Sequence, residues 1–370
     1  MNSLELLQKL VEINSVFPSE QKISLFLQEY LEKIGFSVEV IPTDKSRNNL
    51  IATYGKSTNY LCFYAHMDTV PRDEKGEFEP YKLVIKGDKA FGLGAEDMKG
   101  AIVNILYTAE HAVEHKIPMK IIFAVDEEYI SKGAHDLVNS KKLHDIGFLV
   151  SGESGQIKDF NQPFSVVYGR KGRILIEMGV AGKKSHAADS NHGKNAINDA
   201  ALLIDALSKT HLKRNKYLGE TEFVFQSVHS DTTSFSIPDK CVVSCSVLSV
   251  PGVNYEIIAQ KIKSIAKSLN VAVSVRLVER ETPYGDAYEV DRKGTFLKKL
   301  EKEVFSPNRV TPIYTGSVAD ENIFANRLNI PVISVGPIGG GGHTKDEWLS
   351  VKSFHRMRDI YKSILELYNT

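Results

Sequence analysis

The chain has few cysteines, and they form no recognisable pattern. The 370 residues include three, Cys62, Cys241 and Cys245, an odd number without a CxxC pair. This spacing argues against a disulfide framework and against a zinc site built on thiolates. Free cysteine is among the most frequently buried residue types, so we expect all three to lie in hydrophobic cores.

The sequence also lacks a long hydrophobic run and an excess of either charge. No apolar stretch approaches the roughly 18 residues that span a bilayer, and Glu5, Lys9 and Glu12 interrupt the region where a signal peptide is apolar. The 46 lysines and arginines balance 46 aspartates and glutamates, which gives no electrostatic footprint for nucleic acid. We therefore expect a cytoplasmic protein with neither a membrane nor a nucleic-acid partner.

Length and patterning indicate two domains, because domains average roughly 150 residues. Strand and helix alternate over the first part of the chain, which is typical of a mixed central sheet with helices on both faces. The predicted strands there cover 38–42, 49–54, 60–68, 119–126 and 146–151, and the predicted helices cover 3–13, 20–34, 97–115 and 133–139. Asp97 would begin the third helix, since aspartate is a good N-terminal residue.

The rhythm changes near Gly169. Strands at 174–181, 222–228, 241–250 and 271–279, with helices at 196–207 and 255–269, give a β-α-β-β-α-β order, the signature of a split βαβ, ferredoxin-like unit. Residues 282–291 would lead back to the first domain, which then supplies a helix (294–304), a strand (331–336) and a terminal helix (351–368). The predicted domains are thus 1–168 with 282–370, and an insertion at 169–281.

Candidate functional side chains follow the predicted strands, at the sheet edge where open α/β sheets bind ligands. They are His66, Asp68, Asp97, Glu127, Glu128 and Glu153, joined by His343 after a glycine run that we interpret as a flexible loop.

Two of these groups have specific chemical meanings. His66 and Asp68 share one side of a strand, so the carboxylate can hold the imidazole in one tautomer while the other nitrogen binds metal. Glu127 and Glu128 would repel each other at the end of a buried strand unless cations compensate. Alone, the His-x-Asp pattern is more often structural, and adjacent glutamates also occur in solvated turns.

The ligand types indicate the metal. Imidazoles and carboxylates without thiolate select zinc or a similar divalent ion, with Co2+ or Mn2+ as alternatives. Two histidines with three acids suit a pair of ions that share a bridging carboxylate. We therefore expect two Zn2+ ions as cofactors.

Six stretches resemble motifs of the M20 metallopeptidases, a family that includes acetylornithine deacetylase, succinyl-diaminopimelate desuccinylase, carboxypeptidase G and aminoacylases. They are AHMDTVP (65–71), GLGAEDMKG (92–100), DEE (126–128), GES (152–154), GKKSHAA (182–188) and GHTKDEW (342–348), in family order across nearly the whole chain. The resemblance implies a zinc-peptidase-like catalytic domain with an inserted ferredoxin-like α+β lid and dimerisation domain.

The resemblance also implies residue roles. His66 and Glu128 would bind one metal, Glu153 and His343 the other, and Asp97 would bridge them. Asp68 would orient His66. Glu127 would be the general base that takes a proton from the bridging water and passes it to the leaving amine.

The inserted domain carries a further implied role. In the family it forms a homodimer, and the histidine of the SHAA-like motif reaches the active site of the partner subunit. Here that residue is His186, which would donate a hydrogen bond to the oxyanion. The alternative is an ordinary surface histidine. The other histidines (His111, His115, His135, His144, His192, His211, His229 and His355) have no partner motif, and we interpret them as structural or solvated.

Departures from the family pattern bear on the substrate. Leu93 stands where many members have arginine, Ser246-Val247-Leu248 replaces a stretch with a carboxylate-gripping arginine, and Phe235 replaces an asparagine. Arg276, Arg280, Arg327 or backbone amides near Gly316 are possible substitutes.

The substrate expected from the sequence is a small N-acyl amino acid, because the GES stretch resembles the GEP of acetylornithine and acetyl-lysine deacetylases. A metallo-carboxypeptidase or dipeptidase acting on short peptides is the alternative among enzymes. A non-catalytic, metal-dependent small-molecule binding protein is the alternative of another class.

Overall fold

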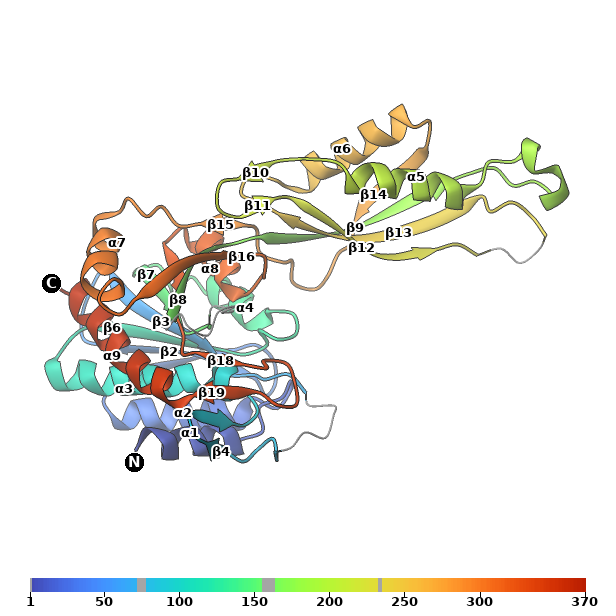
Figure 1. Cartoon of the computed structure of the whole chain (residues 1–370). Helices are drawn as coiled ribbons and strands as arrows, with labels where there is room; N and C mark the ends of the chain where they lie inside the picture. The colour runs from blue at the N-terminus through green and yellow to red at the C-terminus, as the bar shows by residue number, and fades with distance from the viewer. Residues whose placement is uncertain (1, 72–77, 155–163, 232–234) are drawn as a thin grey trace. The chain divides into compact units, whose positions relative to one another are not determined.

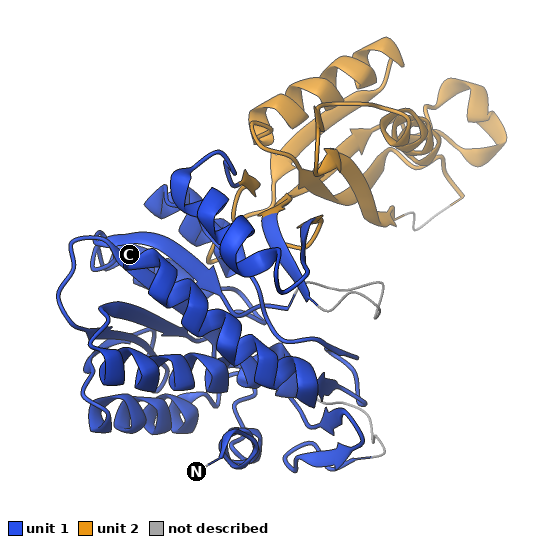
Figure 2. Cartoon of the chain, turned by 60° about the vertical axis from the view of Figure 1, so that its left-hand side comes forward, with its two compact units in different colours: residues 1–168, 290–313, 319–370 blue, residues 169–289, 314–318 orange. Residues whose placement is uncertain are grey.

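The computed structural model of the chain describes residues 2–71, 78–154, 164–231 and 235–370. The chain forms two compact units, which Figure 2 shows in different colours. Unit 1 comprises Met1–Tyr168, Val290–Ile313 and Ala319–Thr370, and unit 2 comprises Gly169–Glu289 and Tyr314–Val318. The second unit therefore extends past its last long strand to Glu289. It also includes the short separate segment Tyr314–Val318.

A mixed sheet organises unit 1 (Figure 1). Its strand order is β1-β2-β6-β3-β7-β17-β8-β15, with β16 beside β8. The strands are β1 (Ser37–Pro42), β2 (Asn48–Tyr54), β3 (Tyr60–His66), β6 (Met119–Ala124), β7 (Ile146–Ser151), β8 (Phe164–Arg170), β15 (Tyr288–Glu289), β16 (Val310–Thr315) and β17 (Val332–Ser334). The four central strands β6, β3, β7 and β17 run parallel to one another.

The connections of β3 create a reversal in the sheet. Helix α3 (Gly100–His115) leads from β3 to β6, and α4 (Lys132–Asn139) leads from β6 across to β7 on the other side of β3. Right-handed crossovers in opposite directions place the two helices on opposite faces. Helix α9 (Val351–Tyr368) packs beside α3, and α8 (Asp320–Leu328) packs beside α4 (Figure 1). Such a reversal opens a crevice at the carboxyl ends of the strands.

The remaining helices of unit 1 are α1 (Ser3–Glu12), α2 (Gln21–Lys33) and α7 (Thr295–Leu300), and a small second sheet is formed by β4 (Val84–Lys86), β5 (Lys89–Phe91), β18 (Gly339–Gly340) and β19 (Trp348–Ser350). Every residue of β3 is buried, as its nearly continuous apolar sequence predicts. All three cysteines are buried, as expected.

The predicted start of the third helix is wrong. Ala95–Lys99 forms a distorted turn in which Asp97 has φ −119° and ψ 90°, and α3 begins only at Gly100. Asp97 is therefore not a helix cap. The turn presents its carboxylate beside the strand ends instead.

Unit 2 has the predicted element order, namely β9 (Gly172–Ala181), α5 (Ala196–Ser208), β12 (Glu222–His229), β13 (Lys240–Ser249), α6 (Tyr255–Ser268) and β14 (Ala272–Leu277). The strands form an antiparallel sheet in the order β12-β13-β9-β14. Apolar side chains of the sheet, such as Met178 and Val243, form one core with Leu203 of α5 and Ile262 of α6. Buried residues alternate with partly buried ones along most of β9 and β13, which explains this one-sided core.

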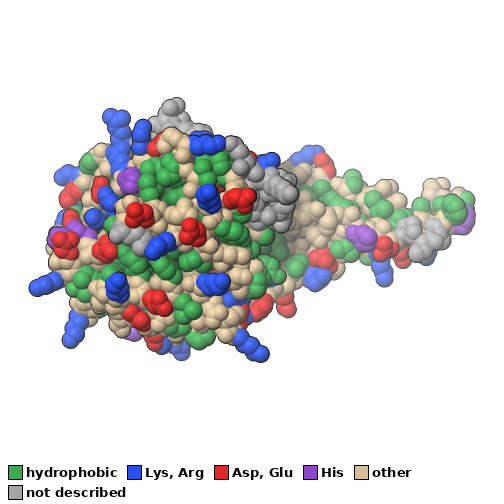
Figure 3. Space-filling model, turned by 90° about the horizontal axis from the view of Figure 1, so that it is seen from below, with side chains coloured by type: hydrophobic (Ala, Val, Ile, Leu, Met, Phe, Trp, Pro, Cys, Tyr) green, Lys and Arg blue, Asp and Glu red, His purple; other side chains and the backbone are tan. Residues whose placement is uncertain are grey.

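Within the described residues, no helix is long and apolar enough to cross a membrane. On the face shown in Figure 3, acidic and basic side chains are interspersed, as the balanced composition leads one to expect.

Candidate metal centre

Three neighbouring strands deliver acids and an imidazole to one edge of the sheet. Strand β3 ends at His66, Glu127 and Glu128 lie in the turn after β6, and Glu153 follows β7. Because β6, β3 and β7 are parallel, these positions meet at the same edge.

His66 lies at the centre of the cluster. Its ring is fully buried, and Nε2 lies 3.0 Å from Asp97 Oδ1 and 3.1 Å from Glu153 Oε1. The opposite nitrogen, Nδ1, lies 3.0 Å from the main-chain oxygen of Asp68 and 3.5 Å from its Oδ1. That oxygen can only accept, so the proton belongs on Nδ1, and Nε2 is the nitrogen that can bind a metal.

His343 approaches the cluster from the other side. Its Nε2 lies 3.0 Å from Glu128 Oε2 and 3.4 Å from Asp97 Oδ2. The two oxygens of Asp97 thus face two different imidazoles, which is the arrangement expected of a bridging carboxylate. His343 is 57% exposed, so the cluster opens to solvent beside this residue.

These contacts differ from the pairing that the family resemblance suggested. The direct contacts join His66 to Glu153 and His343 to Glu128, rather than His66 to Glu128 and Glu153 to His343. Donor atoms of His66, Asp97 and Glu128 nevertheless lie within 4.8 Å of one another, so the whole set is compact. The order of the motifs predicts which residues are candidate ligands. It does not predict which of them lie next to each other.

Asp68 supports two parts of the cluster at once. Besides its contact with His66, its carboxylate accepts hydrogen bonds from the backbone N–H groups of Glu127 (3.2 Å) and Glu128 (2.9 Å). The same fully buried side chain therefore fixes both the imidazole and the glutamate turn. The two adjacent glutamates are thus presented by a turn that Asp68 holds in place.

Electrostatics make this cluster unfavourable without further cations. Burial raises the pKa of Glu153 to about 7, with repulsion from Asp97 adding to the shift. Burial and the neighbouring acids also raise the pKa of Glu128, and that of Glu127 well above its ordinary value. Hydrogen bonds to Asp97 and Glu128 raise the pKa of His343 to about 10. The raised pKa values of the three glutamates mean that their negative charges are unfavourable here, and that of His343 means that a positive charge beside them is favourable. Positive charge would therefore stabilise the cluster.

The residues present fit divalent metal ions. Glu128 Oε1 is buried and has no hydrogen-bond partner among the described residues, so it is a donor available to a cation. The donors are imidazole nitrogens and carboxylate oxygens without thiolate, a set that suits zinc and similar ions. Glu127 contacts neither imidazole in the described part of the chain. Its contacts therefore do not group it with the candidate metal ligands.

Sequence reasoning did not identify the residue that holds Asp97 in place. Glu347, 5% exposed, accepts hydrogen bonds through Oε1 from the backbone N–H groups of Glu96 (2.8 Å) and Asp97 (3.1 Å), and through Oε2 from that of Gly94 (2.8 Å). One carboxylate thus fixes the distorted turn that carries the central ligand. The only signal was its place in the GHTKDEW stretch.

A second unrecognised residue, Arg47, stabilises the glutamate turn. Its guanidinium lies 2.6 Å from Asp126 Oδ1 and 3.4 Å from Glu20 Oε1. Asp126 also accepts the backbone N–H of Lys132 at 2.9 Å. The three acids of the DEE stretch therefore have different surroundings, and the first is structural.

The first two glycines of the run before His343 belong to a strand and not to a loop. Gly339 belongs to β18, where an added Cβ would lie 2.1 Å from Glu96 Cγ and 2.4 Å from the main-chain oxygen of Trp348. These glycines allow close packing against the turn of Asp97. Gly341 follows the strand, and Gly342 and His343 lie in a turn, so only the first half of the run is part of the small sheet.

The remaining predicted residue, His186, lies in unit 2. Its Nδ1 accepts a hydrogen bond from the backbone N–H of Ala188 at 3.1 Å, at the start of the short helix Ala187–His192. The ring proton is therefore on Nε2, and this nitrogen can donate a hydrogen bond. The side chain is exposed.

Comparison with known proteins identifies the family. The sequence profile of Peptidase family M20/M25/M40 matches residues 62–367, which include every residue of the cluster. The chain belongs to this family. It is accordingly a metallohydrolase that acts on peptide or amide bonds.

Several solved structures share the fold over nearly the whole chain. An aminopeptidase PepT from Bacillus cereus matches with a TM-score of 0.81 at 20% identity, over 100% of this chain and 98% of that chain. A tripeptidase from Staphylococcus aureus matches with a TM-score of 0.76 at 22% identity, over 98% of each chain. A dinuclear metal-binding peptidase from Bacillus subtilis matches with a TM-score of 0.73 at 15% identity, over 100% of this chain and 98% of that one.

The contacts of Glu347 generate a prediction for metal binding. Glu347→Gln replaces one accepting oxygen with an N–H2 group that faces backbone donors, so the Asp97 turn should loosen. Changes in such supporting contacts typically reduce metal affinity about 10- to 100-fold. Zinc affinity measured by chelator competition should fall by this amount, whereas the exposed control Glu12→Gln should match the wild type. Unchanged affinity in Glu347→Gln would show that the turn holds its shape without this carboxylate.

Proposed function

We propose that unit 1 hydrolyses an amide bond in short peptides with the help of two divalent cations, Zn2+ in the first instance. The observation that supports this proposal is the position of Asp97, whose two oxygens face His66 and His343 separately. We assign His66 and Glu153 to one ion and His343 and Glu128 to the other. When bound, such ions lower the pKa of a water molecule and polarise the scissile carbonyl.

Glu127 is the proposed general base. Burial, followed by the charges of Asp320, Glu153 and Glu128, raises its pKa well above the ordinary value. A carboxylate with a raised pKa can accept a proton from water and return it to the leaving amine near neutral pH. The hydrogen bond from its backbone N–H to Asp68 holds it beside the ligands without making it one of them.

The choice of substrate rests on two considerations. Structural relatives of this chain include an aminopeptidase and a tripeptidase, which favours peptides over the N-acyl amino acids expected from the GES stretch. In addition, the hydroxyl of Ser154, which distinguishes that stretch, donates to Glu96 Oε1. The serine therefore has a packing role next to the Asp97 turn, and the stretch does not by itself indicate a deacylase. The deacylase remains the second candidate.

The arginines considered for binding the substrate carboxylate have other partners. Arg276 pairs with Glu177 at 2.7 Å, Arg327 donates to Asn139 at 3.0 Å, and the guanidinium of Arg280 lies 3.9 Å from the centre of the Tyr284 ring. Leu93 is 4% exposed and belongs to the core. We infer that none of these three arginines binds the free carboxylate of a substrate. This is compatible with recognition of a peptide through its amino end.

We further propose that unit 2 forms a homodimer and that His186 donates to the oxyanion in the partner's site. Strand β12 is the outer strand of its sheet, and Val224 and Val228 on it are 44% and 52% exposed. An apolar outer strand is a surface that proteins normally cover. The proton on His186 Nε2 suits a donor role.

A substrate panel tests the proposed function. The metal-reconstituted protein should cleave dipeptides or tripeptides with a kcat/KM at least about 10-fold above that for N-acetyl amino acids, which corresponds to about 1.4 kcal/mol of differential transition-state binding. Release of amine from both substrate classes, measured side by side, decides the point. Turnover of N-acetyl amino acids alone would establish the second candidate.

A pair of adjacent substitutions tests the base. Glu127→Gln should lower kcat by about 10²- to 10⁴-fold, the usual contribution of general acid–base catalysis, and should retain both metal ions. Glu128→Gln is the matched control, because it removes a ligand and should lose metal. Metal content by mass spectrometry and kcat distinguish the two. A normal rate in Glu127→Gln would mean that another group takes the proton.

Mixed dimers test the role of His186. His186→Ala should reduce kcat by about 10²- to 10³-fold, the usual effect of losing one oxyanion donor, whereas the nearby exposed His192→Ala should not. When His186→Ala and Glu127→Gln subunits are mixed equally, about a quarter of wild-type activity should return if His186 acts on the partner's site. No recovery from subunits shown to exchange would show that His186 does not act on the partner's site, and an unchanged kcat in His186→Ala alone would place it outside the reaction.

A further inference from the structure

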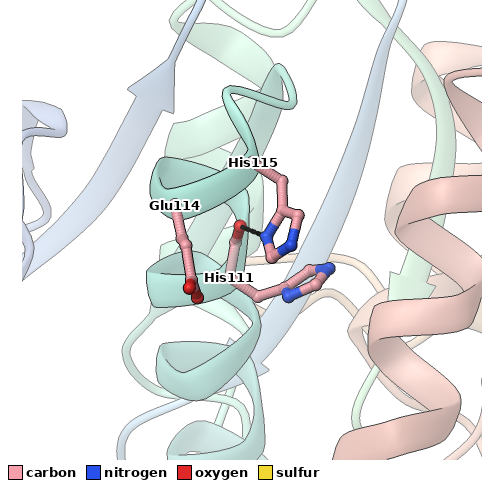
Figure 4. Close-up of side chains that lie close together, drawn as sticks. All are labelled: His111, Glu114 and His115. Carbon is pink, nitrogen blue, oxygen red and sulfur yellow. Dashed lines mark hydrogen bonds between the residues drawn. The ribbon is translucent and has the colours of Figure 1, made fainter.

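A second group of metal-binding side chains lies at the far end of α3. His111, Glu114 and His115 each offer a donor atom within 4.8 Å of those of the other two (Figure 4). Helix α3 begins at Gly100, directly after the Asp97 turn, and ends at His115. At 1.5 Å per residue, this group lies roughly 20 Å along the helix from the metal centre, and it is therefore a separate site.

The spacing on the helix explains why the three side chains meet. Residues three and four apart project from the same face of an α-helix. His111, Glu114 and His115 stand at positions i, i+3 and i+4, and the ring centres of the two histidines are 4.0 Å apart. The sequence His-x-x-Glu-His has the spacing of known helix-borne zinc ligands.

Each imidazole has one nitrogen already committed. His115 Nδ1 lies 3.0 Å from the main-chain oxygen of His111, the contact drawn in Figure 4. His111 Nε2 lies 2.7 Å from Glu366 Oε1, a carboxylate oxygen contributed by α9. Both partners accept only, so the protons belong on these two nitrogens. His111 Nδ1 and His115 Nε2 are left with lone pairs.

This is the arrangement that characterises metal-ligating histidines, in which one ring nitrogen donates to a carbonyl or carboxylate and the other binds the ion. Glu366 would orient His111 as such a carboxylate. Glu114 and His115 are exposed, so an ion can reach the donors from solvent. The contact with Glu366 also ties the end of α3 to α9.

We propose that His111, Glu114 and His115 form a third metal site, which binds a divalent transition ion such as Zn2+, with solvent completing the coordination. Two imidazoles and one carboxylate are ligands that suit zinc and its neighbours. The site lies outside the catalytic machinery. Its role is to fasten the last turn of α3 against α9, independently of the reaction proposed for the centre.

Metal stoichiometry tests this proposal. Metal-free wild type, His115→Ala and the control His144→Ala are titrated with Zn2+ and dialysed, and bound zinc is counted. His144 is an exposed histidine whose Nδ1 also contacts a main-chain oxygen, that of Lys141. His115→Ala should bind about one equivalent less than wild type, because a single ligand histidine is removed, whereas His144→Ala should bind the same amount. Amide hydrolysis should be unchanged in both.

A second variant tests the orienting carboxylate. Glu366→Gln should weaken this ion by about 10- to 100-fold without abolishing it, as is usual for a group that orients a ligand. Equal zinc content in His115→Ala and wild type would overturn the proposal. A loss of activity in proportion to lost zinc would also overturn it, because the ion would then belong to the catalytic centre. The comparison between variants holds whether or not the catalytic centre is fully loaded.

Discussion

The structure of unit 1 depends on the need to hold buried carboxylates close together. Asp97, Glu127, Glu128 and Glu153 converge at one sheet edge, where two imidazoles accompany them among the described residues. The raised pKa values of Glu127, Glu128 and Glu153 show the electrostatic cost of this arrangement without further cations. Divalent ions would remove that cost by neutralising the carboxylates. The repulsion between the carboxylates therefore favours the metal-bound state over the metal-free state.

Backbone topology and a few buried acids make this convergence possible. The reversal of connections around β3 opens the sheet edge, and carboxylates that bind no metal then fix the turns that carry the ligands. Asp68 holds the glutamate turn, and Glu347 holds the turn of Asp97. Backbone N–H groups are good partners for these supporting carboxylates, because they satisfy the charge locally and leave the imidazoles for the ions.

Much of the fold was predictable, because hydrophobic periodicity is strong in the long helices and in buried strands such as β3. Local sequence could not predict the distorted turn at Asp97, since its shape is imposed by Glu347, some 250 residues away. Strands β8 and β16 and helix α8 were also not predicted. The ligand residues were recognisable as motifs. Their pairing was not, because it depends on which strand ends face each other across the sheet.

The central claim is that Asp97 lies between two ions. Anomalous X-ray diffraction at the zinc edge from a zinc-loaded crystal tests it directly. The account predicts two peaks, one near His66 Nε2 and Glu153 and one near His343 Nε2 and Glu128, each about 2.0–2.2 Å from an oxygen of Asp97. A single peak in the centre, or two peaks of which neither touches Asp97, would contradict it.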